Sequence, residues 1–200
     1  MSLNTWEHRY QQGDTGWDRG KPSPALTYWL HHGLDSKQRI LIPGCGRGHE
    51  AVALAKLGFE VTALDLAPSA IQDLKQSLEQ QGLHADLVCQ DLYQYEPENA
   101  AFDAIYEQTC LCALEPQQRQ AYADKLASWL NPKGRLYFSM MQTGKAGGPP
   151  YHCDWLDMKT LFPDTQWQWQ TTPPMLIPRP QGAHYELAFL LQKRTMEANS

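Results

Sequence analysis

A glycine-rich turn between an apolar strand and a helix constrains the fold of this chain more than any other feature. Residues 40–42 (Ile-Leu-Ile) predict a strand, and the loop that follows carries Gly44, Gly46 and Gly48. A helix with one apolar face comes next, and a second apolar strand ends at Asp65. Glycines at a strand-to-helix turn let a ligand approach the backbone, and the helix N-terminus offers free N–H groups to an anion. A carboxylate at the tip of the next strand is placed to accept both hydroxyls of a ribose.

The spacing of the three glycines discriminates between nucleoside ligands. A dinucleotide-binding turn needs Gly-x-Gly-x-x-Gly, whose third glycine would fall at position 49, and His49 stands there. Here the third glycine comes one residue earlier, at Gly48. The resulting Gly-x-Gly-x-Gly pattern resembles motif I of class I S-adenosylmethionine (SAM) methyltransferases, and this resemblance implies SAM as the cofactor in place of NAD. The alternative, a glycine-rich turn without a ligand, is disfavoured because Asp65 stands where a ribose partner is needed.

Length and charge exclude several classes of partner. Two hundred residues fit one α/β domain, which we expect to span residues 1–200, with residues 1–23 as an aromatic lid segment that carries no predicted helix or strand. The net charge of −5 argues against nucleic acid, because phosphate binding needs a basic face. No basic run suits a membrane surface, and no stretch approaches the roughly 20 apolar residues of a transmembrane helix. The first residues also lack the pattern of a secretory signal.

The cysteines indicate reduced thiols in apolar surroundings. There are five of them, an odd number, and Cys110 and Cys112 form a single Cys-x-Cys pair. Such a pair lacks the second pair of ligands that a zinc site needs. We therefore expect no metal site, and a soluble, cytoplasmic protein.

Strand and helix patterns alternate along the chain. Besides the helix after the glycine loop, helices are predicted over residues 24–33, 69–81, 116–130 and 155–162. Strands are predicted at 40–42, in the segment that ends at Asp65, and at 85–89, 102–106, 135–141, 166–171 and 186–192. This alternation predicts an α/β fold with a doubly wound, mostly parallel, seven-stranded sheet and crossover helices on both faces. The predicted fold is the Rossmann-like fold of class I SAM-dependent methyltransferases.

Chemically useful residues fall at the ends of several predicted strands. In a doubly wound sheet, ligands bind at the carboxyl ends of the strands, and the glycine loop, Asp65, Asp91 and Glu107 all stand at such ends. Asp91 can accept a hydrogen bond from an adenine amino group, with the backbone of Leu92 beside it. The alternative for Asp91 is a structural role as the cap of a turn.

Four stretches resemble one family of methyltransferases. The first is Trp-x3-Tyr-x6-Trp-Asp-x-Gly at residues 6–20, and the second is Ile-Pro-Gly-Cys-Gly-Arg-Gly-His-Glu at residues 42–50. The third runs from Ile105 to Pro116, and the fourth is Gly-Gly-Pro-Pro-Tyr at residues 147–151. Together they resemble the thiopurine S-methyltransferase superfamily, and within it most of all the branch of plant-type thiol, thiocyanate and halide methyltransferases.

The resemblance implies a role for each residue that matches the family's motifs. The aromatic segment folds over the cofactor, the glycine loop holds its methionine moiety, and the two aspartates face its ribose and adenine. Tyr10 stands where the family often has tryptophan, and Glu107 stands in the place of an aspartate that faces the cofactor. The implied cofactor-binding residues are Trp6, Tyr10, Trp17, Gly44, Cys45, Gly46, Gly48, Asp65, Leu66, Asp91, Leu92 and Glu107.

The same resemblance places Gln108 and Tyr151 in the pocket of the methyl acceptor. Thiopurine-type members carry an arginine where Gln108 stands, and a glutamine has no positive charge to hold an aromatic thiolate. Tyr151 is the candidate catalytic residue, since its hydroxyl can donate to an incoming anion or take a thiol proton. We therefore expect a monomeric, SAM-dependent methyltransferase of a small soft nucleophile, namely a thiol, hydrosulfide, thiocyanate or halide.

Two alternatives remain open. One is a thiopurine- or metalloid-detoxifying methyltransferase of the same fold, acting on tellurite or selenite in the second case. The other is a weakly catalytic SAM-binding regulatory protein. Residues 149–151 also compare with the Asn/Asp-Pro-Pro-Tyr motif of enzymes that methylate amino groups on DNA. That motif follows the fourth strand, whereas this one follows the fifth predicted strand and is preceded by glycine, so we reject nucleic acid as the substrate.

Overall fold

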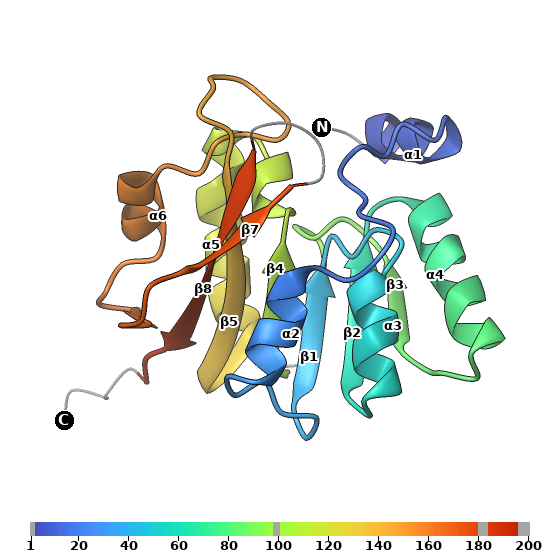
Figure 1. The fold of residues 1–200 in the computed structure, drawn as a ribbon, viewed down its shortest axis with the longest axis horizontal. Helices are drawn as coiled ribbons and strands as arrows, with labels where there is room; N and C mark the ends of the chain where they lie inside the picture. The colour runs from blue at the N-terminus through green and yellow to red at the C-terminus, as the bar shows by residue number, and fades with distance from the viewer. Residues whose placement is uncertain (1–2, 98–100, 180–183, 196–200) are drawn as a thin grey trace. The chain divides into compact units, whose positions relative to one another are not determined.

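The computed structural model describes residues 3–97, 101–179 and 184–195. These residues belong to two compact units, Met1–Tyr95 and Glu96–Ser200 (Figure 1).

The first unit is built on three parallel strands. They are β1 (Arg39–Pro43), β2 (Glu60–Asp65) and β3 (Asp86–Cys89), in the order β3-β2-β1. Pro43 is in register with Leu64, and Asp65 is in register with Cys89. The three strands therefore end at one edge, where the glycine loop follows β1 and the turn at Asp91 follows β3.

Four helices accompany this sheet: α1 (Leu3–Gln11), α2 (Pro24–Leu30), α3 (His49–Lys56) and α4 (Pro68–Gln80). The apolar faces of α3 and α4 pack against β2, and Leu54, Leu74 and Leu78 on those faces are buried. Figure 1 shows α1 beside the first turn of α4, which it contacts. This arrangement follows the apolar spacing at every third or fourth position that the sequence shows in α3 and α4.

The helix α1 is a difference from the sequence analysis, which predicts no element in residues 1–23. Its sequence has no continuous apolar stripe, so local pattern does not reveal it. Its position depends on a contact distant in the chain: the carboxylate of Glu7 accepts hydrogen bonds from the backbone N–H of Ser69 at 3.0 Å and from its hydroxyl at 2.6 Å. These bonds place an acidic side chain at the N-terminus of α4, which the helix dipole favours.

The second unit combines one parallel and several antiparallel strand pairs. Its strands are β4 (Phe102–Gln108), β5 (Leu130–Gln142), β6 (Trp167–Trp169), β7 (Met175–Pro178) and β8 (Tyr185–Lys193). The order is β4-β5-β8-β6, with β4 parallel to β5 and with β8 antiparallel to β5, β6 and β7. Its helices are α5 (Arg119–Trp129) and α6 (Trp155–Leu161), and the short 3-10 turns Leu111–Ala113 and Pro116–Gln118 precede α5.

Two strands of this unit differ from the expectation. The described residues contain eight strands where the sequence predicts seven, because Met175–Pro178 pairs with the first half of β8. The strand β5 also begins five residues earlier than predicted, directly after α5. Leu130 is in register with Phe102, and the side-chain amide of Asn131 donates to Asp103 at 2.6 Å. Both differences arise from pairing between distant segments, which local sequence does not report.

None of the helices in the described part of the chain is long and apolar enough to cross a membrane.

The packing of α4 against the glycine loop generates a prediction for Gly48. This residue has φ of +70°, and a Cβ built on it would lie 2.4 Å from Cδ1 of the buried Leu74. We expect Gly48→Ala to lower the free energy of unfolding by about 2–5 kcal/mol, because a left-handed alanine costs about 1–2 kcal/mol and overpacking costs about 1–3 kcal/mol. Gly58→Ala is the control, since Gly58 has φ of +85° with nothing within 4 Å. Urea unfolding measures both, and equal losses would contradict the packing argument.

Candidate functional site

The carboxylate of Asp65 ties the glycine loop to the end of β2. Its Oδ2 accepts a hydrogen bond from the backbone N–H of Gly46 at 2.8 Å, and its Oδ1 accepts one from Ala67 at 2.9 Å. Burial raises the pKa of the Asp65 carboxyl, and the N–H groups of Ala67, Gly46 and Leu66 act in the opposite direction. One side chain therefore organises both the loop after β1 and the start of α4, and the carboxylate keeps acceptor capacity for a ligand.

The glycine loop presents its backbone to the aromatic segment, which we define as residues 5–23. Gly46 has φ of +55°, and a Cβ built on it would lie 3.0 Å from the hydroxyl oxygen of Tyr10. Burial, and then the charge of Asp65, raise the pKa of the Tyr10 hydroxyl. Tyr10 therefore lies against the loop, and a side chain larger than hydrogen at position 46 would displace its hydroxyl. A role of this segment in covering the cofactor stays a prediction.

The three aromatic residues that the sequence singles out lie together. The ring of Trp17 packs edge-on against Trp6, with centroids 5.3 Å apart, and against Tyr10, with centroids 5.5 Å apart. The guanidinium of Arg9 lies 4.3 Å from the centroid of the Trp17 ring. We call Trp6, Tyr10 and Trp17 the aromatic cluster.

At the end of β3, Asp91 caps a turn. Its Oδ1 accepts the backbone N–H of Tyr93 at 2.9 Å, and its carbonyl accepts the N–H groups of Gln94 and Tyr95. Asp91 therefore has the structural role of a turn cap, which uses one of its two carboxylate oxygens. Leu92 and Leu66, the neighbours of the two aspartates, are half-buried. An adenine contact at Asp91 and Leu92 stays a prediction.

In the second unit, Glu107 is a buried carboxyl near the end of β4. Its Oε1 accepts the backbone N–H of Leu111 at 2.6 Å, whereas its Oε2 is buried with no hydrogen-bond partner among the described residues. Burial raises the pKa of Glu107 to about 8, Glu186 adds to the rise, and Arg119 acts against it. A buried acceptor without a partner is rare, and a ligand donor would satisfy it.

Gln108 belongs to a hydrogen-bond network of polar side chains that was not predicted from the sequence. Its Oε1 accepts the hydroxyl of Tyr106 at 3.1 Å, and its Nε2 donates to Glu186 of β8 at 3.3 Å. Glu186 is fully buried and also accepts Nη1 of Arg179 at 3.0 Å. Both ends of the Gln108 amide are therefore engaged. No local signal in residues 179–186 reveals this contact, since strand pairing alone brings Glu186 beside β5.

Tyr151 is held in its loop from several sides. Its backbone N–H donates to the carbonyl of Cys112 at 2.7 Å, and a Cβ on Gly148 would lie 2.5 Å from its ring. The guanidinium of the buried Arg119 lies 6.0 Å from the centroid of the Tyr151 ring and donates to the carbonyl of His152 at 3.1 Å. The loop that the sequence assigns to the acceptor is thus anchored to α5 and to the turn before it.

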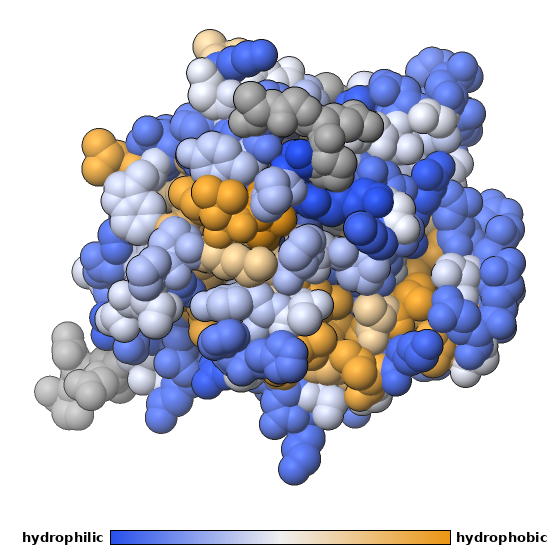
Figure 2. Space-filling model, in the orientation of Figure 1, coloured by the Kyte–Doolittle hydropathy of each residue, from blue (hydrophilic) through white to orange (hydrophobic). Residues whose placement is uncertain are grey.

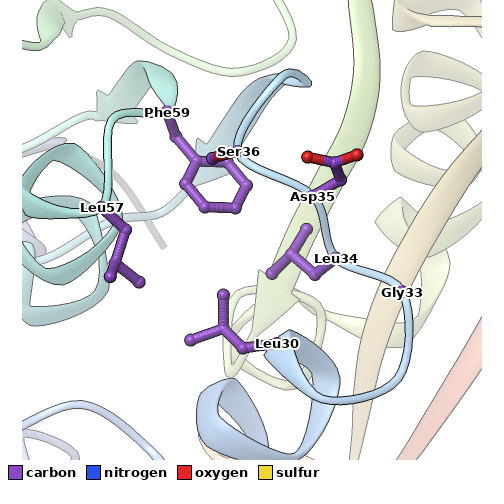
Figure 3. Close-up of a pocket in the computed structure, with 7 residues that line it drawn as sticks. All are labelled: Leu30, Gly33, Leu34, Asp35, Ser36, Leu57 and Phe59. Atoms are coloured by element: carbon purple, nitrogen blue, oxygen red, sulfur yellow. The ribbon is translucent and has the colours of Figure 1, made fainter.

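The first unit also contains an open groove lined by apolar and polar residues, which is a different feature from the candidate site. Leu30, Leu34, Leu57 and Phe59 point toward one another around a volume of about 450 Å³ (Figure 3). Figure 2 shows hydrophobic side chains at the surface in the region of α2 and α3. The residues of the groove precede β1 and β2, so it lies at the amino ends of the strands, opposite to the edge where the glycine loop lies.

The cysteines are not joined by disulfides. Four of the five are buried, and Cys89 is exposed. Burial raises the pKa of Cys153 to about 11, and it raises the pKa of Cys112 well above its ordinary value. Within residues 3–97, 101–179 and 184–195, no group of three or more His, Cys, Asp or Glu side chains could hold a metal ion.

Comparison with known proteins matches most of the chain. The thiopurine S-methyltransferase family model matches residues 1–176. The Arabidopsis thaliana protein named "Probable thiol methyltransferase 2" is 34% identical over 157 residues, which are 76% of this chain and 69% of that protein. Thiocyanate methyltransferase 1 of Brassica oleracea is 33% identical over 73% of this chain and 66% of its own length. A thiopurine S-methyltransferase of Pseudomonas fluorescens is 29% identical over 76% of each chain.

Solved structures agree on the fold. A Burkholderia thailandensis 1,6-didemethyltoxoflavin-N1-methyltransferase with bound S-adenosylhomocysteine superposes with a TM-score of 0.77, at 19% identity, over 96% of this chain and 87% of that one. Magnesium protoporphyrin IX methyltransferase of Synechocystis PCC 6803 with bound SAM gives a TM-score of 0.74, at 16% identity, over 96% of this chain and 97% of that one. The predicted class I SAM-dependent methyltransferase fold is confirmed.

The buried Glu107 generates a prediction on pH dependence. Its pKa rises from an ordinary value of 4.5 to about 8 on folding, so between these pH values the folded state binds more protons than the unfolded state. The free energy of unfolding should therefore fall as pH rises through this range, by up to about 1.4 kcal/mol per pH unit. Glu107→Gln should remove that fall.

Urea unfolding at pH 5, 6.5 and 8 measures the slope. Glu79→Gln in α4 is the control, because its side chain is 64% exposed and should leave the slope unchanged. Parallel slopes for wild type and Glu107→Gln would contradict the assignment of a neutral, buried carboxyl.

Proposed function

Because the chain belongs to the thiopurine S-methyltransferase family, we propose that it transfers the methyl group of SAM to a small soft nucleophile, such as a thiol, hydrosulfide, thiocyanate or halide ion. The observation that carries the choice of acceptor is Gln108. It is neutral, and both ends of its amide are bound within the unit, by Tyr106 and Glu186. It therefore offers no charge to a bulky ionised heterocycle, for which thiopurine-type members carry an arginine.

The residues of the first unit fit SAM as the cofactor. The bound cofactor supplies a methyl group on a sulfonium, which an in-line displacement delivers to the nucleophile. Asp65 would accept the ribose hydroxyls with its remaining lone pairs, and the backbone of Gly46, against which the Tyr10 hydroxyl lies, would line the site of the methionine moiety. The faces of Trp6 and Trp17 would favour a sulfonium by about 0.5–2 kcal/mol.

In the second unit, the unpaired Oε2 of Glu107 fits a cationic donor. An ammonium group beside it would favour the charged carboxylate and lower its raised pKa. We propose the methionine ammonium as this donor. Among the residues of the family's motifs, Glu107 combines full burial with an acceptor that no described residue satisfies.

Tyr151 is the proposed catalytic residue toward the acceptor. A soft anion needs no strong general base once it is ionised, so the protein has to hold it and exclude water. The Tyr151 hydroxyl would donate a hydrogen bond to the anion, or take the proton of a neutral thiol. The anchored loop supports this role, because a fixed donor loses little freedom when it binds a compact ion.

The proposal includes a monomeric, cytoplasmic enzyme with a small-molecule acceptor and no nucleic acid partner. The net charge of −5 supports the last point. The acceptor named for the Pseudomonas relative, a thiopurine, is the second candidate.

A panel of acceptors tests the proposal. We expect kcat/KM for hydrosulfide or a small thiol to exceed that for a thiopurine at least about tenfold, which corresponds to about 1.4 kcal/mol in the barrier. Tyr151→Phe should reduce activity with the small acceptor and leave SAM affinity nearly unchanged. Tyr28→Phe in α2 is the control, because Tyr28 stacks on His32 and belongs to none of the four motif stretches.

Methylated product is measured by mass spectrometry. A thiopurine that proves the better substrate would overturn the choice of acceptor, and a fully active Tyr151→Phe would remove Tyr151 from catalysis.

A further inference from the structure

The carboxylate of Asp18 collects three hydrogen bonds in the first unit. Its Oδ1 accepts the backbone N–H of Gly20 at 2.7 Å and lies 2.8 Å from Nε2 of His49, and its Oδ2 accepts Nη1 of Arg47 at 3.2 Å. The side chain of Asp18 is only 12% exposed. Exposed ion pairs contribute little, but a shielded carboxylate with several charged donors forms stronger, charge-assisted hydrogen bonds.

The partners of Asp18 belong to the glycine loop itself. Arg47 stands between Gly46 and Gly48, and His49 is the first residue of α3. Arg47 is fixed on its other side, because its Nε donates to Asp73 of α4 at 3.0 Å. Asp18 therefore connects the aromatic segment directly to the loop that the proposed function assigns to the cofactor.

Next to Asp18 is Trp17, the centre of the aromatic cluster. Trp17 contacts both Trp6 and Tyr10, and the Tyr10 hydroxyl lies against Gly46. Holding Asp18 at the loop consequently fixes the position of all three rings.

The segment has an attachment on each side of Asp18. At its start Glu7 binds Ser69 of α4, and at its end the backbone N–H of Ser23 donates to Glu50 of α3 at 2.8 Å. Between these two points, the Asp18 contacts join the segment to the glycine loop.

We propose that Asp18 is a positioning residue for the cofactor: by binding Arg47 and His49, it holds the aromatic cluster against the glycine loop. The inference rests on the proposed function, because the loop is taken as the cofactor's binding site. The resemblance to the family assigns no role to Asp18. Within residues 6–20 it assigns only Trp6, Tyr10 and Trp17 to the cofactor.

The charges of the cluster support this assignment. The His49 hydrogen bond, the Gly20 N–H and Arg47 hold the pKa of Asp18 down at about 2, against the effect of burial, so it is ionised at every working pH. Asp18 raises the pKa of His49, with Glu50 adding to the rise and burial and Arg47 opposing it. The stabilisation that charged His49 gives to its pair with Asp18 is therefore complete below the ordinary histidine pKa of 6.5. It is lost as pH rises through the raised pKa of His49, whereas Arg47 stays charged.

Titration calorimetry with SAM and S-adenosylhomocysteine tests the proposal on wild type, Asp18→Asn and Asp14→Asn. We expect Asp18→Asn to weaken binding of both at least about fivefold, to raise KM for SAM, and to leave kcat at saturating SAM within about twofold. Asp14→Asn is the matched control, because Asp14 also pairs with an arginine of the segment but its side chain is 65% exposed. It should bind like wild type.

Hydrogen exchange without ligand is the second readout. In Asp18→Asn and in His49→Gln, amides of residues 5–20 should lose protection relative to wild type and Asp14→Asn, while those of β1 and β2 keep theirs. In wild type, that protection should decline as pH rises beyond 6.5 through the raised pKa of His49, and the decline should be absent in His49→Gln. Wild-type affinity together with wild-type protection in Asp18→Asn would overturn the inference. A wild type that binds no SAM would instead overturn the proposed function, and the exchange comparison would still decide on Asp18.

Discussion

The first unit depends on the hydrogen bonds of one carboxylate. Asp65 accepts the N–H of Gly46 with one oxygen and the N–H of Ala67 with the other, so the loop after β1 and the helix after β2 share a single anchor. The residue before the first glycine is Pro43, which has no carboxylate to bind the loop. Asp65 therefore organises the loop from the neighbouring strand, in addition to the ribose contact that we assign to it.

Asp65 and Glu107, two of the acidic residues at strand ends, illustrate two different states of a carboxyl group before a ligand binds. Asp65 is already hydrogen-bonded by backbone donors, which pre-organises the loop for a ligand. Glu107 is buried with one oxygen unsatisfied, and its pKa is raised to about 8. A cationic ligand would relieve this cost, so part of the binding free energy at Glu107 would come from the removal of a penalty already present in the free protein.

Sequence predicts the local features well and the long-range features poorly. The glycine spacing and the apolar periodicity of α3 and α4 identify the fold, and the strand-end positions of Asp65 and Glu107 follow from it. The helix α1, the strand β7 and the contact between Gln108 and Glu186 were missed, because each depends on residues far apart in the chain. Asp18 had a visible signal in the Trp-Asp-x-Gly stretch, but its partners, Arg47 and His49, are known only from the structure.

Calorimetric titration of SAM into wild type and Asp65→Asn tests whether the loop organised by Asp65 binds SAM. An amide at position 65 would turn one acceptor into a donor that faces a backbone N–H, so we predict a loss of about 1.5–3 kcal/mol, or about 10- to 150-fold in affinity. Asp86→Asn, whose side chain is 76% exposed at the start of β3, should bind like wild type. Unchanged SAM affinity in a folded Asp65→Asn protein would contradict the account.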